Sequence, residues 1–312
     1  LSDWSSDVCS SDLLRQNAQS GYRIRATRVR GRPAAQKERH SSYGSWPLLR
    51  CLQCDGMCDL GFDSRVAQEE TISLTLRTLV ILPTYNEKDS LEETVSHLLA
   101  AQPSVSVLIV DDASPDGTGE IANRLSESDA RISVLHRSQK AGLGPAYLAG
   151  FELGLGEGYD LLVEMDADGS HRAQDLSSLL KAAQSADLVI GSRWVPGGSV
   201  QNWPWHPQLI SRVGNTYARV LLGSKIKDMT AGFRAYRADL LKEVVHDDLA
   251  AHGYAFQVEL AWRSERSGAS VVEVPITFIE REHGTSKMSS AIVREALWLI
   301  TTWGFRRLFT RG

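Results

Sequence analysis

Residues 161–168 read Leu-Leu-Val-Glu-Met-Asp-Ala-Asp, an apolar run that ends in two carboxylates one residue apart. A run of this kind is typical of a strand buried in a parallel sheet. In an open α/β sheet, ligands bind at the carboxyl ends of the strands, where Asp166 and Asp168 are expected. Two carboxylates at this spacing suit a hard divalent cation that also binds phosphate oxygens. The alternative is a turn in which Asp168 and Gly169 only end the strand.

Strands and helices alternate along the chain from Arg77 onward. Apolar runs at 78–82, 105–110 and 132–135 predict three strands before the 161–168 stretch, and segments with helical periodicity separate them. This alternation predicts an α/β fold with a mostly parallel sheet flanked by helices and right-handed crossovers. Polar residues follow three of the strands, at 83–87, 111–112 and 166–168. We expect these three segments to converge on one edge of the sheet.

Composition and missing motifs exclude several classes of protein. The chain has 312 residues and a formal net charge of −4, which argues against a dedicated nucleic-acid binder. The first turn has no G-x-G-x-x-G, and no G-x-x-x-x-G-K-[ST] occurs, which disfavours a dinucleotide-binding dehydrogenase and a P-loop ATPase. No apolar run reaches the roughly 18–20 residues that cross a bilayer. The pattern therefore favours a nucleotide site that holds a diphosphate through a metal.

The first 76 residues differ in pattern from residues 77–312. Residues 1–13 are rich in Ser and Asp, no periodic apolar face precedes Thr71, and residues 15–39 carry eight cations against Glu38 alone. We interpret residues 1–76 as a disordered or non-native N-terminal extension, although the basic part could also contact a membrane surface or nucleic acid. The four cysteines lie at 9, 51, 54 and 58. Three of them could bind zinc with His40, but the second half of a zinc signature is missing.

Eight motifs along residues 78–290 carry a resemblance to a known family. They are Pro83-Thr84-Tyr85-Asn86-Glu87, Val110-Asp111-Asp112-Ala113-Ser114-Pro115-Asp116-Gly117-Thr118, Gly142-Leu143-Gly144, Met165-Asp166-Ala167-Asp168-Gly169-Ser170-His171, Gly191-Ser192-Arg193-Trp194, Asp228-Met229-Thr230-Ala231-Gly232-Phe233-Arg234, Gly253-Tyr254-Ala255-Phe256-Gln257-Val258-Glu259 and Arg281-Glu282-His283-Gly284-Thr285-Ser286-Lys287-Met288. In this order and spacing they resemble the polyprenol-phosphate mannosyltransferases, which are dolichol-phosphate mannose synthase-like enzymes of the second glycosyltransferase family.

The resemblance implies a fold and an activity. The expected fold is a single GT-A-type, Rossmann-like catalytic domain over residues 77–290. The expected reaction moves mannose from GDP-mannose to a polyprenyl phosphate with inversion, giving a β-linked product. Two alternatives stay open: the same reaction with another nucleotide sugar, such as glucose or an aminosugar, and a non-catalytic sugar-nucleotide-binding subunit.

The resemblance also implies roles for individual residues. Contacts with guanine and ribose are expected from Pro83, Tyr85, Glu87, Val110 and Asp112. Asp166 and Asp168 are expected to hold Mg²⁺ or Mn²⁺ on the diphosphate, with Ala167 close to the nucleotide. The residues expected to bind the donor and to carry catalysis are Asp168, Arg193, Arg281 and Lys287. Arg212 and Arg234 are candidates for the acceptor phosphate, and Arg234 is alternatively an internal partner of Asp228.

No general base is expected, because a lipid phosphate with a second pKa near 6 is largely ionised at neutral pH. Beside Arg193, the aromatic segment 196–207 either receives a polyprenyl chain or is a surface loop with buried anchors. Residues 291–312 are expected to form an amphipathic helix, either packed on the domain or lying on the cytoplasmic face of a membrane. Relatives with C-terminal spans or a partner subunit make a separate membrane-anchoring subunit a further expected partner. No nucleic-acid partner is expected.

Overall fold

A computed structural model of the chain describes residues 23–24, 76–245, 249, 254–281 and 290–309. The chain divides into two units, the first of which comprises Leu1–Thr27 and Leu76–Gly312. The second unit, Arg28–Thr75, lies outside the described residues, as do the four cysteines. The nature of residues 1–76 therefore stays a prediction.

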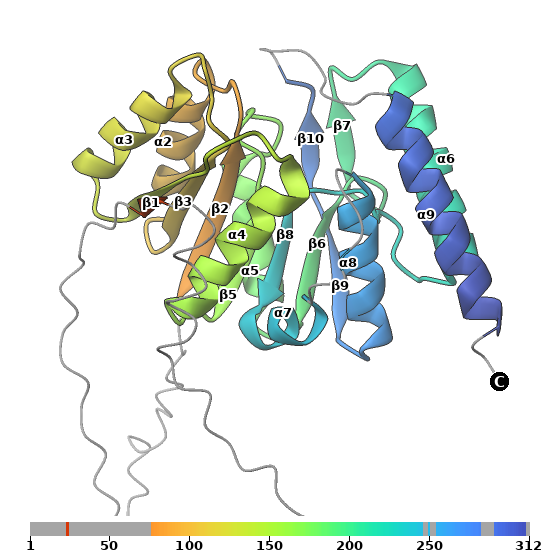
Figure 1. The fold of residues 1–312 in the computed structure, drawn as a ribbon. Helices are drawn as coiled ribbons and strands as arrows, with labels where there is room; N and C mark the ends of the chain where they lie inside the picture. Colours follow the sequence, from red (N-terminus) through yellow and green to blue (C-terminus); the bar gives the residue numbers. More distant parts are fainter. Residues whose placement is uncertain (1–22, 25–75, 246–248, 250–253, 282–289, 310–312) are drawn as a thin grey trace, which may run out of the picture. The chain divides into compact units, whose positions relative to one another are not determined.

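One large sheet lies at the centre of the described part of the first unit (Figure 1). Its strands are β1 (Arg23–Ile24), β2 (Thr78–Thr84), β3 (Ser106–Asp111), β4 (Ile132–His136), β5 (Leu161–Glu164), β6 (Leu188–Ser192), β8 (Arg234–Arg237) and β9 (Val271–Pro275). They lie side by side in the order β1-β4-β3-β2-β5-β8-β6-β9. Only β1 and β8 run against the others, so the predicted mostly parallel sheet is confirmed.

Helices cover both faces of this sheet. They are α2 (Leu91–Ala101), α3 (Thr118–Ser128), α4 (Leu143–Gly156), α5 (Leu176–Ala182), α6 (Trp205–Leu222), α7 (Ala238–Val244), α8 (Tyr254–Arg266) and α9 (Ser290–Phe309), with a short 3₁₀ helix at Ala173–Asp175. Residues of α2, α3 and α5 share one apolar cluster, and residues of α4, α6, α7, α8 and α9 share the other. The two clusters fill the opposite faces of the sheet.

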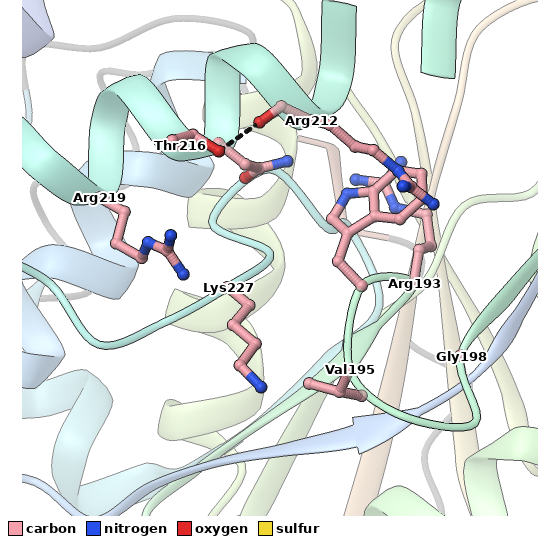
Figure 2. A pocket seen from close by; sticks show the side chains of 9 residues that line it. Arg193, Val195, Gly198, Arg212, Thr216, Arg219 and Lys227 are labelled. Atoms are coloured by element: carbon pink, nitrogen blue, oxygen red, sulfur yellow. Dashed lines mark hydrogen bonds between the residues drawn. The ribbon is translucent and has the colours of Figure 1, made fainter. Parts of the chain in front are cut away.

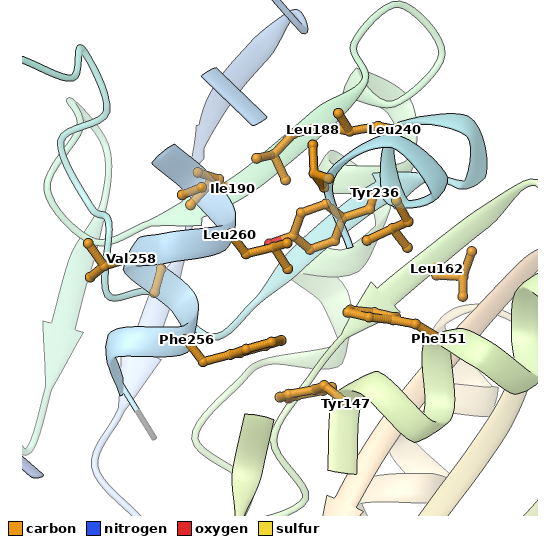
Figure 3. Packing of buried hydrophobic residues seen from close by; sticks show 14 of the residues in the cluster. Tyr147, Phe151, Leu162, Leu188, Ile190, Tyr236, Leu240, Phe256, Val258 and Leu260 are labelled. Carbon is orange, nitrogen blue, oxygen red and sulfur yellow. The ribbon is translucent and has the colours of Figure 1, made fainter. Parts of the chain in front are cut away.

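The alternation of side chains along β2 explains why it occupies the middle of the sheet. Leu79 and Ile81 belong to the cluster that contains α4, whereas Val80 and Leu82 belong to the cluster that contains α2. All four are at most 1% exposed. Burying a side chain of this size contributes about 1.5–3 kcal/mol, so a strand that is apolar on both faces is most stable between two helical layers. Figure 3 shows the aromatic part of the first cluster, where Tyr147 and Phe151 of α4 meet Tyr236 and Phe256.

Helix α4 lies unusually close to the sheet because it has glycines on its inner face. A Cβ atom at Gly150 would lie 2.7 Å from Ile81 Cγ2, and one at Gly154 would lie 2.7 Å from Leu162 Cδ2. Both distances are shorter than van der Waals contact, so larger residues would push the helix away. This close packing holds the start of α4 near the carboxyl ends of β2 and β5.

The three polar segments that follow strands do meet at one edge. Strand β2 pairs in parallel with β3 on one side and with β5 on the other. Asp112 N–H donates to the carbonyl of Thr84 at 3.0 Å, and Met165 N–H donates to the carbonyl of Ile81 at 3.2 Å. The expected convergence of these strand ends is therefore confirmed.

The C-terminal region differs from the prediction in one respect and agrees in another. The apolar pattern predicts one strand over residues 271–278, but the chain forms β9 and the separate β10 (Thr277–Ile279), which pairs in parallel with β7 (Ser199–Gln201). Pro275 lacks an N–H donor and ends the first ladder. The expected terminal helix is α9, which packs on α6 through a 2.7 Å hydrogen bond between the hydroxyls of Tyr217 and Thr301. Over the described residues, no helix combines the length and apolar character that crossing a bilayer requires.

Candidate active site

The two carboxylates after β5 lie beside an arginine from the far end of the domain. Asp168 Oδ1 accepts a hydrogen bond from Ser170 N–H at 3.1 Å, and Asp168 Oδ2 lies 3.3 Å from Arg281 Nη1. Arg281 follows β10, so the pair joins segments that are remote in sequence. The structure thus brings together two of the predicted catalytic residues. Of the other two, Arg193 lies at the end of β6, and Lys287 lies outside the described residues.

Asp166 has two aromatic neighbours that sequence reasoning assigned no role. Tyr147 of α4 donates a hydrogen bond from its hydroxyl to Asp166 Oδ1 at 3.3 Å. His171 Nε2 lies 3.4 Å from Asp166 Oδ2 in ion-pair geometry that makes no hydrogen bond, and Phe233 and Phe278 pack against its ring. Tyr147 gives no sequence signal, because it is indistinguishable from a core residue of an amphipathic helix.

These neighbours set the protonation of the site. Burial alone would raise the pKa of the Asp166 carboxyl. The neighbouring His171 ring, the positive charge of Arg281 and the hydrogen bond from the Tyr147 hydroxyl act in the opposite direction, and together they hold that pKa below its ordinary value. Burial, with the nearby Asp166 charge, raises the pKa of Tyr147 well above its ordinary value. Asp166 is therefore ionised at neutral pH, and Tyr147 keeps the proton that it donates.

The donor set at this edge fits a divalent metal. The side chain of Asp166 is 34% exposed, whereas that of Asp168 is 8% exposed, so the pair presents oxygens to solvent from one side. In the described part of the chain, no cluster of three or more histidine, cysteine or acidic side chains forms a closed metal site. Two carboxylates with open positions suit Mg²⁺ or Mn²⁺, whose remaining ligands are phosphate oxygens and water.

The position of Arg234 in β8 corrects one prediction. Arg234 is fully buried, and its guanidinium donates to the carbonyls of Met229, Ala231 and Gln257 at 2.7 Å each. It therefore cannot reach an acceptor phosphate, and no hydrogen bond links it to Asp228. Its register partner across the sheet is Glu164. Burial raises the pKa of the Glu164 carboxyl to about 8, although the Arg234 charge acts in the opposite direction.

The residues predicted to hold the nucleoside lie at the ends of β2 and β3. Tyr85 and Glu87 follow β2 and are partly exposed. Lys140 places its Nζ 3.9 Å from the centre of the Tyr85 ring, and Glu87 N–H donates to Thr118 Oγ1 at 3.0 Å. Tyr85 thus presents a flat aromatic surface at the edge where the three strand ends meet.

Asp112 has partners that the sequence did not indicate. Its Oδ1 lies 2.6 Å from Arg137 Nη1, and its Oδ2 accepts hydrogen bonds from the N–H groups of Ala141 at 3.0 Å and Gly142 at 3.1 Å. These bonds fix the loop that leads into α4. The side chain of Asp112 therefore orders the edge of the predicted nucleoside site.

Three further predicted contact residues lie at the same strand ends with limited side-chain exposure. Val110 and Ala167 are buried in the two apolar clusters, and Pro83 is the register partner of Val110. The Ala167 carbonyl accepts a hydrogen bond from Thr94 Oγ1 at 3.2 Å. A contact of Val110 or Ala167 with a nucleotide would therefore involve mainly backbone atoms.

Arg193, at the end of β6, is held by a buried carboxylate. Its Nε and Nη2 donate to Asp228 at 2.8 Å and 2.7 Å, and Thr230 Oγ1 accepts a further bond from Nη2 at 3.0 Å. The guanidinium carbon of Arg193 lies 5.6 Å from the centre of the Trp203 ring and 5.5 Å from the centre of the Phe278 ring. Trp203 of the aromatic segment is thus a partly buried anchor beside Arg193, and contact of the segment with a polyprenyl chain stays a prediction.

A basic pocket opens next to Arg193 (Figure 2). Its volume is about 320 Å³, and its lining residues are Arg193, Trp194, Val195, Gly198, Arg212, Asn215, Thr216, Arg219 and Lys227. Arg212, predicted from sequence, lies over the Trp194 ring at 4.5 Å. Arg219 and Lys227 were missed, because scattered surface cations carry no motif. The lining contains four cations and no acidic residue.

One short segment links this pocket to the carboxylates. Asp228 binds Arg193, and four residues later Gly232 lies so close to Asp166 that a Cβ atom there would be 3.4 Å from Oδ2. The carboxylate pair and the basic pocket are therefore neighbouring sites. Such an arrangement can hold a metal-bound diphosphate beside a second anionic group.

Relatives of established name share much of the sequence. The chain is 54% identical over 244 residues to the polyprenol monophosphomannose synthase of Mycolicibacterium smegmatis, covering 78% of this chain and 92% of the relative. It is also 54% identical over 229 residues to the undecaprenyl-phosphate mannosyltransferase of Micrococcus luteus, covering 73% of this chain and 94% of that protein.

Solved structures share the fold. The mannosyltransferase PcManGT from Pyrobaculum calidifontis, solved with GDP-Man and Mn²⁺, superposes with a TM-score of 0.50 at 19% identity over 77% of this chain and 66% of that chain. Glucosyl-3-phosphoglycerate synthase from Mycobacterium tuberculosis, solved with UDP, gives a TM-score of 0.56 at 18% identity over 74% of this chain and 80% of that chain. Residues 79–245 match the sequence profile of glycosyl transferase family 2. The chain therefore belongs to glycosyl transferase family 2, and the GT-A-type fold that its motifs predicted is the fold that it has.

Proposed function

We propose that this protein transfers mannose from GDP-mannose to a polyprenyl phosphate, with inversion at the anomeric carbon, to give polyprenyl phosphate β-mannose and GDP. One observation carries the proposal: the segment from Asp228 to Gly232 joins a basic pocket to a carboxylate pair that fits a metal. The names of the two relatives at 54% identity support the sugar and the lipid acceptor.

The donor binds at the edge where β2, β3 and β5 end. Tyr85 and Glu87 contact the nucleoside, and Asp166 and Asp168 hold Mg²⁺ or Mn²⁺ against the diphosphate. A bound metal supplies Lewis-acid stabilisation of the charge that builds on the leaving GDP. Arg281, 3.3 Å from Asp168, adds a fixed positive charge to the same diphosphate. Lys287, six residues later, is proposed to complete this set of donor contacts.

The acceptor phosphate binds in the basic pocket. Arg212 donates to its oxygens, and Arg193 is held at the same end of the pocket by Asp228. The phosphate arrives ionised, because its second pKa is near 6, so catalysis needs alignment more than proton transfer. Direct displacement by a phosphate oxygen forms the new bond as the bond from the anomeric carbon to the diphosphate breaks. This single displacement inverts the configuration of the sugar.

A membrane surface supplies the acceptor. The helices α6 and α9 lie side by side, and eight large apolar side chains on them are exposed: Trp205, Leu209, Ile210, Val213, Val220, Leu297, Trp298 and Phe305. Of the exposed large apolar residues in the described part of the chain, only Val272 lies elsewhere. Exposed Trp and aliphatic side chains near Arg306 fit a peripheral position on the cytoplasmic face of a membrane. A membrane-anchoring subunit is a further proposed partner.

A transfer assay tests this function. The purified chain is incubated with radiolabelled GDP-mannose, polyprenyl phosphate in detergent, and Mg²⁺ or Mn²⁺. We expect label to move into the lipid phase, and we expect EDTA to stop the transfer. The anomeric configuration of mannose in the intact lipid product, measured by NMR, then checks the stereochemistry, and an α-linked product would overturn inversion. Binding of UDP-glucose or another nucleotide sugar in place of GDP-mannose would overturn the donor assignment.

A further inference from the structure

Two cations in the basic pocket have no part in the proposed reaction. Arg219 and Lys227 line the pocket, and within the described residues neither side chain forms an ion pair; Glu273 Oε2 accepts the backbone N–H of Lys227 at 2.8 Å but is not part of the pocket lining. Asp228 compensates Arg193, whereas the pocket lining supplies no carboxylate to the side chains of Arg212, Arg219 and Lys227. One lipid phosphate carries at most two negative charges, so the pocket has positive charge in excess of what the acceptor neutralises.

The excess charge lies at a separate end of the pocket. Figure 2 shows the side chains of Arg219 and Lys227 on one side and those of Arg193 and Arg212 on the other, with Thr216 between them. Arg212 and Arg219 are seven residues apart on α6, which places their backbones roughly 10 Å apart along the helix. These two cations are thus spread along about two turns of the helix.

The same helix presents an apolar surface directly beside each end. Val213, next to Arg212 in sequence, is 59% exposed, and Val220, next to Arg219, is 68% exposed. Helix α6 therefore has cations along one border of an exposed apolar stripe. This arrangement is the one by which a helix lies in a bilayer interface, with apolar side chains among the acyl chains and cations at the level of the phosphates.

We propose that Arg219 and Lys227 form a binding site for the phosphate of an anionic phospholipid, next to the lipid acceptor. The inference rests on the proposed function, because both phosphates belong to neighbouring lipids of one membrane surface. The bound phospholipid fixes the direction of α6 on the bilayer and presents the Arg212 end of the pocket to the acceptor. Charge complementarity selects an anionic headgroup, since a choline group would add a third positive charge to that end.

Vesicle binding by the full-length chain tests the site without donor or acceptor. The double variant Arg219→Ala/Lys227→Ala is compared with Arg124→Ala/Lys181→Ala, which removes two exposed cations from α3 and α5. All proteins share the basic segment 15–39, so its contribution cancels. On phosphatidylglycerol–phosphatidylcholine vesicles we expect the first variant to bind about tenfold to thirtyfold more weakly than the unaltered chain. Equal losses for both variants would show general charge attraction and overturn the site.

A soluble lipid separates a binding site from a charged surface. Dihexanoyl phosphatidylglycerol, used below its micelle-forming concentration, should bind saturably to the unaltered chain and measurably more weakly to Arg219→Ala/Lys227→Ala. Dihexanoyl phosphatidylcholine should not compete. If inorganic phosphate binds as tightly as the lipid, the occupant is a free anion and the proposal is wrong. Neither titration contains GDP-mannose, so failure of mannosyl transfer and failure of the lipid site are distinguishable.

Discussion

Arg193 and Asp228 form a bidentate ion pair at the boundary between the carboxylate site and the basic pocket, with N–O distances of 2.8 Å and 2.7 Å. The same carboxylate also accepts the backbone N–H of Arg193 at 2.9 Å. Asp228 is fully buried, and its own N–H donates to Glu273 Oε1 at 2.9 Å. The position of the Arg193 guanidinium is therefore set before any substrate binds, which reduces the cost of ordering it.

The variant Asp228→Asn should be markedly less stable than the unaltered chain. It leaves the buried Arg193 charge without its counter-ion, which typically lowers the free energy of unfolding by about 3–5 kcal/mol. Urea unfolding followed by circular dichroism measures this change. The matched control is Asp239→Asn, whose partner Lys242 is also charged but whose side chain is 95% exposed; little change is expected there. Equal effects of the two substitutions would show that the buried pair does not stabilise the fold.

Acid should remove the contribution of Asp228. Burial alone would raise the pKa of its carboxyl, but the charge and hydrogen bonds of Arg193 hold that pKa below the ordinary value. Because the folded pKa is depressed, the stabilisation is complete above the unfolded pKa of about 3.9 and is lost as pH falls through the folded pKa. The difference in unfolding free energy between the unaltered chain and Asp228→Asn should be constant near neutrality and shrink below about pH 4. A difference that grows on acidification would contradict this assignment.

The parts of the site that follow from strand order were predictable from sequence. Apolar runs ending in polar residues at 83–87, 111–112 and 166–168 predicted three strand ends at one edge, because parallel strands align their carboxyl ends. The family resemblance also implied that Arg281 and Asp168 act at one site, and the two side chains lie 3.3 Å apart. Periodicity was sufficient for the strand ends, whereas the placement of Arg281 depended on the resemblance.

Side-chain partnerships were not predictable in the same way. Arg234 lies in a motif with Asp228, yet its guanidinium is turned to backbone carbonyls, while Arg193 takes the carboxylate. Tyr147 has the spacing of a core residue. Its hydroxyl reaches Asp166 only because Tyr147 lies near the start of α4, beside the carboxyl end of β5. Which polar group faces which depends on packing between elements, and a sequence without that geometry gives no signal for it.

Replacing Asp168 by Asn should abolish most transfer while the fold is kept. The substitution removes one of the two charges proposed to hold the metal, and loss of such transition-state stabilisation typically lowers turnover by about 10²–10³-fold. Turnover of GDP-mannose at saturating metal measures the effect, and the control is Asp129→Asn, which lies at the end of α3 beside Arg131. Unchanged turnover with Asp168→Asn would remove the metal role from this residue.

Replacing Tyr147 by Phe should weaken metal binding without removing a ligand. The variant loses only the hydroxyl that donates to Asp166 at 3.3 Å, and loss of an outer hydrogen bond of this kind typically costs about 10–100-fold in metal affinity or activity. The Mn²⁺ concentration that gives half-maximal transfer measures the change. Tyr217→Phe is the control, because it removes a hydroxyl bonded to Thr301 of α9. If both variants need the same Mn²⁺ concentration, Tyr147 does not orient Asp166.

Replacing Arg212 by Ala should affect the acceptor and not the donor. Arg212 lines the basic pocket over Trp194, whereas the carboxylates and Arg281 lie on the other side of the segment from Asp228 to Gly232. Loss of a charged hydrogen bond to phosphate typically costs about 1.5–3 kcal/mol, so the KM for polyprenyl phosphate should rise about 10–100-fold. The KM for GDP-mannose should change far less, because nucleoside and diphosphate contacts are retained.

Steady-state kinetics with each substrate varied in turn separates the two constants. The variant Arg212→Lys keeps the charge but not the planar fork, so its KM for polyprenyl phosphate should lie between those of the unaltered chain and Arg212→Ala. Equal increases in both KM values would mean that Arg212 supports the whole site rather than the acceptor phosphate.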